Sequence, residues 1–257
     1  MEKRGDVIAV TGPNPRDSSP ESVWKEKKTI LVVLAHPDDP EFFCGASLAM
    51  WSSQGHEIHY CLLTQGDKGT DRRDVSGEEL KKMRQEEQKA ASALIGVRSV
   101  RFLDYEDGFL APSTQAKKDV VRVIRQVKPD ILVTSDPTNY YPRESYLNHP
   151  DHRQAGEIAL SAVFPAAGNP MFFPELIAQE GLEPHPVKEI WVTLTHEPNL
   201  FLDVTKFWEQ KILALYEHRS QIGDPAQLRE RMLSRRTVDS TREKPRFEEG
   251  FHRLILS

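Results

Sequence analysis

Short apolar runs and amphipathic stretches alternate along most of this 257-residue chain. Residues 29–34 are almost entirely apolar, which is typical of a strand buried on both faces. Residues 42–50 repeat apolar positions at spacings of three and four, so they predict a helix that begins near residue 41 and stops at Gly55. Residues 56–64 then alternate between apolar and polar side chains, which predicts a second strand.

The same two periodicities continue through the rest of the chain. They predict helices over 78–95, 113–128, 151–164, 205–221 and 228–236, and strands over 97–103, 131–134, 189–195, 201–204 and 253–256. Alternating strands and helices favour a parallel sheet with right-handed crossovers and helices on both faces. We therefore expect an α/β fold, a three-layer, Rossmann-like and mostly parallel sheet.

The organisation around this pattern is simple. Residues 1–28 are polar and interrupted by prolines, so we expect an N-terminal arm that could pack on a neighbouring subunit. Residues 29–257 form a single predicted domain. Within it, residues 165–186 contain five prolines and two glycines, and we expect an irregular insertion or lid there.

The first predicted strand leads directly into the sequence Ala-His-Pro-Asp-Asp-Pro-Glu at residues 35–41. Ligands of open α/β sheets bind at this edge, beyond the carboxyl ends of the strands. If the chain turns helically here, His36 and Asp39 point the same way, because they are three residues apart, and Asp38 points elsewhere. This arrangement suits two metal ligands beside one free carboxylate.

A second group of candidate ligands follows the fourth predicted strand, after a long polar loop. His149 and His152 are again three residues apart, with a carboxylate between them. A catalytic zinc takes three protein ligands and keeps one open position. His36, Asp39 and one of the two later histidines would supply the three, and the spacing leaves the choice between them open. A salt-bridge network or a magnesium-type site remains the alternative.

Composition and charge exclude several other classes. The net charge of −5 provides no basic field for nucleic acid. No apolar run reaches the roughly 18 residues of a membrane helix, and the first residues lack the apolar core of a signal peptide. Two cysteines give no disulfide framework, so we expect buried, reduced thiols in a cytoplasmic protein. Cys44 could alternatively be a thiol close to the metal, because it follows the first motif closely.

Several motifs together resemble the zinc-dependent N-acetylglucosaminyl deacetylase family, described as LmbE-like or PIG-L-like, and most nearly its diacetylchitobiose and bacillithiol-type members. They lie in the family's order at residues 35–39, 64–70, 84–87, 103–108, 149–152 and 203–221. The resemblance covers residues 29–222. It departs at Gly45-Ala46, where a glycine pair is common, and at Gln65 in the second motif.

The resemblance implies roles for individual residues around a Zn²⁺ cofactor. By the family pattern His36, Asp39 and His152 are the metal ligands, and Asp38 is the general base. From the residues alone, Asp38 could instead cap the helix that follows it.

The family pattern also assigns four residues around the reacting amide. Protonated His149 would stabilise the oxyanion, and Asp151 would orient His149. Arg84 and Asp107 match positions that hold sugar hydroxyls. Their ordinary alternatives are a salt bridge from Arg84 to a nearby carboxylate and a simple turn at Asp107.

The activity implied by the resemblance is hydrolysis of an N-acetyl group on a small molecule that contains N-acetylglucosamine. An amidase that cleaves a glucosaminide thiol conjugate is a second possibility, and a non-catalytic sugar-binding module is one from another class. We expect an amino-sugar substrate, no nucleic-acid or membrane partner, and a homo-oligomer such as a trimer or hexamer.

Overall fold

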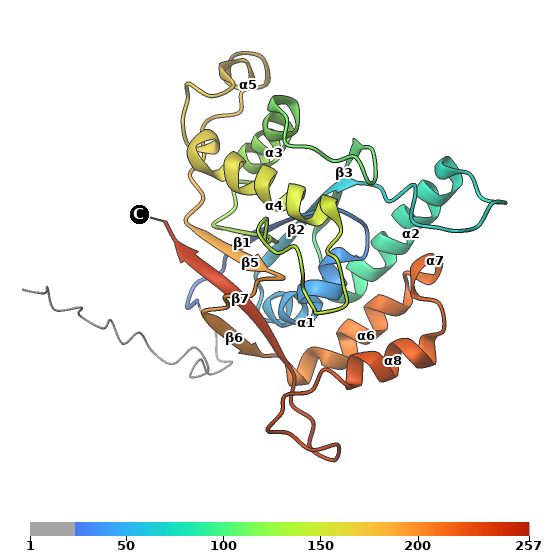
Figure 1. The fold of residues 1–257 in the computed structure, drawn as a ribbon. Helices are drawn as coiled ribbons and strands as arrows, with labels where there is room; N and C mark the ends of the chain where they lie inside the picture. Colours follow the sequence, from blue (N-terminus) through green and yellow to red (C-terminus); the bar gives the residue numbers. More distant parts are fainter. Residues whose placement is uncertain (1–23, 257) are drawn as a thin grey trace, which may run out of the picture.

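A seven-stranded sheet with helices on both faces forms the body of the protein, seen here in a computed structural model that describes residues 24–256 (Figure 1). The strand order is β3-β2-β1-β4-β5-β7-β6. The strands are β1 (Thr29–Leu34), β2 (Glu57–Thr64), β3 (Ser99–Tyr105), β4 (Ile131–Ser135), β5 (Glu189–Thr193), β6 (Leu200–Asp203) and β7 (Glu248–Ile255). The first five strands pair in parallel, and β7 is antiparallel to both of its neighbours, so the expected mostly parallel α/β sheet is confirmed.

The helices divide between the two faces of the sheet (Figure 1). The first face carries α1 (Asp39–Ser53), α2 (Gly77–Ile95), α6 (Trp208–Tyr216), α7 (Arg219–Ile222) and α8 (Pro225–Leu233). The second face carries α3 (Thr114–Val127), α4 (Pro150–Ser161) and α5 (Pro174–Glu180). Among residues 24–256, no helix is both long enough and apolar enough to span a membrane.

Strand β1 shows why its sequence is apolar at successive positions. Ile30, Val32 and Leu34 pack into the core on the first face, whereas Leu31 and Val33 pack into the core on the second. Side chains alternate across a strand, so a central strand covered on both sides needs apolar residues at every position. The strand is thereby fixed at the centre of the sheet, and the loop after it opens at the carboxyl edge.

Most of the predicted arm, residues 1–23, lies outside the described residues. Its last part belongs to the fold, because the indole of Trp24 is buried between Trp51 and Trp191, with ring centroids 5.4 and 5.2 Å away. Trp24 also donates a hydrogen bond to Glu189 at the start of β5. The domain core therefore begins a few residues before β1.

The proline-rich segment 165–186 packs against α3. It contains the end of a π-helical turn (Ala162–Ala167) and all of α5. The buried guanidinium of Arg125, on α3, donates to the carbonyl oxygens of Ala166, Ala167, Asn169 and Phe172. These bonds anchor the segment on the second face of the sheet, and it contributes no side chain to the cavity described below.

The predicted elements over 205–221 and 253–256 differ most from the structure. The helix expected over 205–221 is divided into a 3-10 turn (Thr205–Phe207), α6 and α7, with a non-helical residue at His218. The last strand begins at Glu248 and is therefore longer than the 253–256 predicted. It extends because β7 pairs with β5 on one side and β6 on the other, a long-range pairing that its own pattern does not reveal.

Candidate active site and metal centre

A cavity of about 910 Å³ opens at the carboxyl edge of the parallel strands. It is lined by seven of the eight residues that the sequence singled out: His36, Asp38, Asp39, Arg84, Asp107, His149 and His152. Asp151, the eighth, is fully buried directly behind His36. The loops after β1, β3 and β4 therefore meet, as expected for a parallel sheet.

Asp39 lies between the two predicted histidine ligands. Its Oδ1 is 3.0 Å from Nε2 of His152, and its Oδ2 is 3.4 Å from Nδ1 of His36. The backbone N–H of His36 also donates to Oδ2, at 2.8 Å. Burial by itself would raise the pKa of Asp39, but the charges of His152 and His36 hold that pKa well below the usual carboxyl value. Asp39 is therefore a carboxylate held in place by both rings.

The other nitrogen of His36 faces two more carboxylates. Its Nε2 lies 3.1 Å from Oδ1 of Asp107 and 3.4 Å from Oδ2 of Asp151. This buried nitrogen has no hydrogen-bond partner of acceptable geometry among the described residues. Burial alone would lower the pKa of His36, but Asp39, Asp107 and Asp151 together raise it well above the ordinary imidazole value. The pocket around His36 is strongly suited to positive charge.

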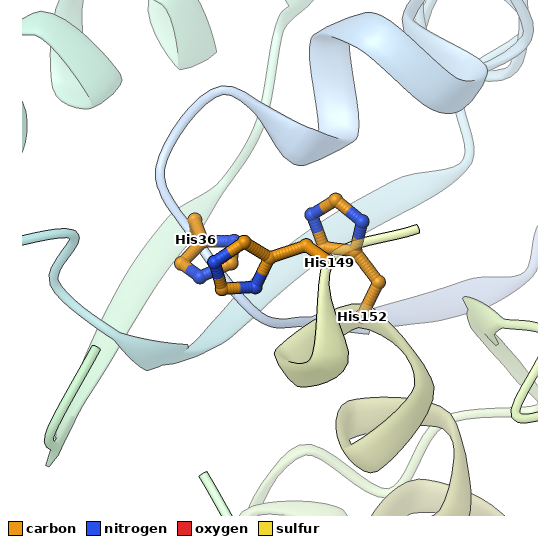
Figure 2. Close-up of side chains that lie close together, drawn as sticks. All are labelled: His36, His149 and His152. Carbon is orange, nitrogen blue, oxygen red and sulfur yellow. The ribbon is translucent and has the colours of Figure 1, made fainter. Parts of the chain in front are cut away.

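Two groups of side chains bring ligand atoms close enough together for a metal ion. One consists of His36, His149 and His152, and the other of His36, Asp107 and Asp151; within each group the atoms lie within 4.8 Å of one another. Figure 2 shows the three imidazoles gathered where the loop after β1 meets the start of α4. Imidazole nitrogens and carboxylate oxygens are ordinary zinc ligands, so both donor sets fit such an ion. Asp39 belongs to neither set, because its carboxylate approaches Nδ1 of His36 and not the orphaned Nε2.

Asp38 occupies a strained backbone position beside this centre. It has φ 86° and ψ −27°, a left-handed conformation, and it precedes α1 without making a side-chain cap to that helix. Its N–H donates to Oε1 of Gln88 at 2.8 Å, and its carboxylate is 3.4 Å from the Arg84 guanidinium. Burial raises the pKa of Asp38 more than Arg84 lowers it. A carboxylate with a raised pKa that is not in contact with His36 or His152 has the properties of a proton acceptor.

Arg84 is buried and ties two loops together. It donates to the carbonyl oxygens of Pro37 at 2.7 Å and Gly66 at 3.0 Å. Gly66 has φ 66°, and a Cβ there would lie 2.1 Å from the guanidinium. The glycine in the second motif is therefore required by the close approach of Arg84. The ion pair of Arg84 is with Asp38, at 3.4 Å, and not with a carboxylate on its own helix.

His149 lines the cavity. The backbone N–H of Asp151 donates to its Nδ1 at 3.2 Å, so a single ring proton resides on Nε2. Burial, followed by the positive charges of His36 and His152, lowers the pKa of His149. A lowered pKa disfavours the protonated form that the family resemblance implies for His149. The Asp151 carboxylate accepts from the N–H groups of Gly108 and Leu110, so its link to His149 runs through its backbone.

A buried polar network beneath Asp38 was missed in the sequence. The Gln88 side chain donates to Glu41, and Nε2 of His218 lies 3.2 Å from the same carboxylate. Burial opposes protonation of His218, but Glu41 raises its pKa above the usual value. Gln88 is one helical turn after Arg84, on the same face of α2, which is the one local signal that pointed toward the site.

A second missed residue orients a predicted ligand. Oδ1 of Asn148 lies 2.9 Å from Nδ1 of His152, while its amide nitrogen donates to the carbonyl oxygen of Asn139. A carbonyl acceptor at Nδ1 fixes the ring proton there and leaves Nε2 free to bind a cation.

The thiol of Cys44 is buried in the core, and burial together with Glu249 raises its pKa, so it behaves as a core residue.

Comparisons with known proteins agree with this geometry. Residues 31–163 match the family model described as PIG-L, GlcNAc-PI de-N-acetylase. The chain is 37% identical over 202 residues to the diacetylchitobiose deacetylase of Thermococcus kodakarensis, covering 78% of this chain and 73% of that protein. It is also 26% identical to the 4-oxalmesaconate hydratase of Pseudomonas putida, covering 79% of this chain and 77% of the relative.

A solved structure gives the same result at the level of the fold. The N,N'-diacetylchitobiose deacetylase of Pyrococcus horikoshii superposes with a TM-score of 0.81 and 30% sequence identity, covering 92% of this chain and 87% of that one. The family model spans the loops after β1, β2, β3 and β4 that bring the candidate ligands together. This chain belongs to the PIG-L family of N-acetylglucosaminyl de-N-acetylases.

Proposed function

We propose that this protein is a zinc-dependent hydrolase that removes the N-acetyl group from a small molecule containing N-acetylglucosamine. The observation that carries this most directly is Asp39, which lies against both His36 and His152, while the adjacent Asp38 remains outside that contact. We assign His36, Asp39 and His152 as the metal ligands. His149, Asp107 and Asp151 also approach His36, and their role is addressed below.

A zinc ion held there would polarise the acetamide carbonyl and lower the pKa of a water molecule toward about 7. Asp38, the carboxylate of the pair that contacts neither histidine, would accept the proton of the attacking water. The same carboxyl then gives the proton to the departing amine. A residue that acts first as general base and then as general acid must lie within hydrogen-bond reach of both the water and the leaving amine. The left-handed backbone and the bond to Gln88 fix that position.

His149 supports the reaction from the opposite side. With Nδ1 occupied by the backbone N–H of Asp151, it offers an Nε2–H donor toward the cavity. A fixed donor aimed at developing negative charge stabilises the transition state more than the ground state. Asp107 and Asp151 lie 3.1 and 3.4 Å from Nε2 of His36 and restrain its ring. Arg84 holds the loops on which Asp38 stands, and Asp107 lines the cavity where sugar hydroxyls would lie.

The test is release of acetate. The zinc-loaded protein is incubated with N-acetylglucosamine, N,N'-diacetylchitobiose and simple N-acetylglucosaminides, and mass spectrometry follows loss of the acetyl group. Turnover of at least one member, abolished by a chelator and restored by zinc, is the expected result. Because one relative is named a hydratase, the family does not by itself fix the reaction. Metal-loaded protein that releases no acetate from any amino sugar would remove the deacetylase proposal.

A further inference from the structure

Three arginines also line the active-site cavity. Arg143 comes from the loop after β4, Arg231 from α8, and Arg235 from the segment that follows α8. Within residues 24–256, none of the three guanidinium groups forms an ion pair with a carboxylate. All three side chains are exposed to solvent, so each is free to bind an anion that enters the cavity they share.

The carboxylates on this part of the cavity wall are already engaged. Glu249, on β7, accepts from the buried ammonium of Lys211 at 2.6 Å and from the backbone N–H of Ser47 at 2.7 Å. Its neighbour Glu248 accepts from Arg246 at 2.6 Å. Both carboxylates are thus paired with other cations and form no ion pair with the three arginines.

The arginines also disfavour one another. Burial, followed by the charges of Arg143 and Arg231, lowers the pKa of Arg235 to about 10, against only a small opposing effect of Glu249. Like charges held together store unfavourable energy, which a bound anion would remove. The arrangement is typical of a site that recognises an anion.

The arginine group and the metal centre share one stretch of wall. Phe42 and Phe43 are consecutive on α1 and both line the cavity. The Arg231 guanidinium lies 5.7 Å from the centre of the Phe42 ring, and the Phe43 ring is 5.1 Å from the ring of His152. A single small molecule lying along these two phenyl rings therefore has the metal ligands at one end and the arginines at the other.

We propose that Arg143, Arg231 and Arg235 form an anion-binding subsite for a phosphate or carboxylate carried by the substrate. The position of the acetamide in this scheme rests on the deacetylase function proposed above, whereas anion binding does not. Guanidinium groups donate two parallel hydrogen bonds to either oxyanion, so the subsite selects acidic amino sugars over neutral ones. It therefore acts on substrate choice and leaves the chemical step unchanged.

Anion binding is tested first, without reference to turnover. Inorganic sulfate is titrated into the full-length, zinc-loaded protein and its heat of binding is recorded. Arg235→Gln and Arg231→Gln should each weaken the affinity about tenfold, since each removes a charge-assisted contact. Arg236→Gln is the matched control, because Arg236 is adjacent to Arg235 and equally exposed but does not line the cavity. Equal sulfate affinity in all four proteins would overturn the subsite.

Substrate selection is tested next, with a matched set of glycosides. Methyl N-acetylglucosaminide is neutral, carboxymethyl N-acetylglucosaminide adds a carboxylate, and N-acetylglucosamine 1-phosphate carries a phosphate. The wild type should show a higher kcat/KM for one acidic compound than for the methyl glycoside. The better of the two acidic compounds identifies the anion. Arg235→Gln should reduce this preference about tenfold, mainly through KM.

The two proposals fail in different ways. If sulfate binding depends on Arg231 and Arg235 but no compound loses its acetyl group, the subsite stands and the deacetylase function falls. The opposite outcome is that the methyl glycoside has the same kcat/KM as the acidic compounds, and that Arg235→Gln changes neither this ratio nor the sulfate affinity. The deacetylase function then stands and the subsite falls. Arg235→Lys keeps the positive charge but loses the two parallel hydrogen bonds of the guanidinium, so it should bind sulfate with intermediate affinity.

Discussion

Asp38 and Asp39 are neighbours with the same side chain, yet their surroundings differ completely. Asp39 is in contact with His36 and His152, which keep its pKa low. Asp38 lies beside Arg84, and burial raises its pKa. The two side chains have different partners, and Asp38 has a left-handed backbone conformation, whereas Asp39 is the first residue of α1. Adjacent carboxylates can therefore take different parts in one reaction.

The first prediction separates these two parts. Asp38→Asn should retain bound zinc and lose turnover by about 10²–10⁴-fold, the usual contribution of a general acid–base group. Asp39→Asn should instead lose the metal. Acetate release measures turnover, and elemental analysis of dialysed protein measures zinc. Loss of zinc from Asp38→Asn with retention in Asp39→Asn would reverse the ligand assignment.

Gln88 is expected to position Asp38 without touching the substrate. Its side chain accepts from the Asp38 N–H and donates to Glu41, so it braces the strained turn. Gln88→Leu should lower kcat about tenfold or more, with zinc content and KM little changed, because small displacements of a catalytic group are costly. Ser92→Ala is the control, since Ser92 contacts Gln88 from the side remote from Asp38. Equal loss of kcat in both variants would indicate a general effect on α2.

The sequence predicted the site residues that lie close together along the chain, and it missed residues that contact the site from distant positions in the sequence. His36 and Asp39 are three residues apart, and so are His149 and His152, so their convergence was predictable from strand ends alone. The bond from Asp38 to Gln88 spans 50 residues. Partners of that kind depend on how α2 packs against α1, which no local pattern specifies.

At the scale of elements, the strands were the most predictable part. Residues 29–34 and 131–134 are short apolar runs, and both are central strands of the sheet. The helix expected over 205–221 was wrong in its continuity. The chain leaves the helical conformation at His218, whose fully buried ring binds Glu41 beneath the active site. A tertiary contact thus overrides a helical periodicity that is otherwise present.

The junction between the N-terminal segment and β2 yields a prediction on pH. Nδ1 of His56 accepts from the Lys28 N–H at 3.0 Å, and its ring packs edge-on against Trp24. Burial, followed by the charge of Lys28, lowers the pKa of His56. The folded protein therefore favours the neutral form of His56. This preference stabilises the fold fully above the unfolded imidazole pKa of about 6.5, and the stabilisation is lost as the pH falls from there through the lower pKa of the folded state.

His56→Asn removes the titration while keeping an oxygen acceptor near the Lys28 N–H. The wild type should lose more unfolding free energy between pH 7 and pH 5 than this variant does. Urea denaturation at the two pH values, followed by tryptophan fluorescence, measures the difference. His59→Asn is the control, because His59 is bonded to side chains at the outer edge of the sheet. An identical pH dependence in wild type and His56→Asn would contradict the assignment.

At the scale of the whole molecule, the fold concentrates buried negative charge at one point. Asp39, Asp107 and Asp151 surround His36, and all three carboxylates are at most 5% exposed. Asp39 begins α1, Asp107 follows β3 and Asp151 is in the first turn of α4, so their mutual repulsion opposes the assembly of the sheet's carboxyl edge. A divalent cation bound there would stabilise the folded state relative to the unfolded one.

Metal removal should therefore lower the stability of the entire domain. With zinc at 100 to 1,000 times its dissociation constant, chelation should reduce the unfolding free energy by about 3–4 kcal/mol, through binding to the folded state alone. Thermal unfolding with and without chelator measures this change. His152→Ala should unfold at the same temperature in both conditions, whereas His185→Ala, on the segment that packs against α3, should keep the full chelator effect. If the unfolding temperature of the wild type does not change with chelator, the cluster of His36 and its carboxylates is stabilised by its own ion pairs. This salt-bridge network is the alternative that the spacing of these residues left open.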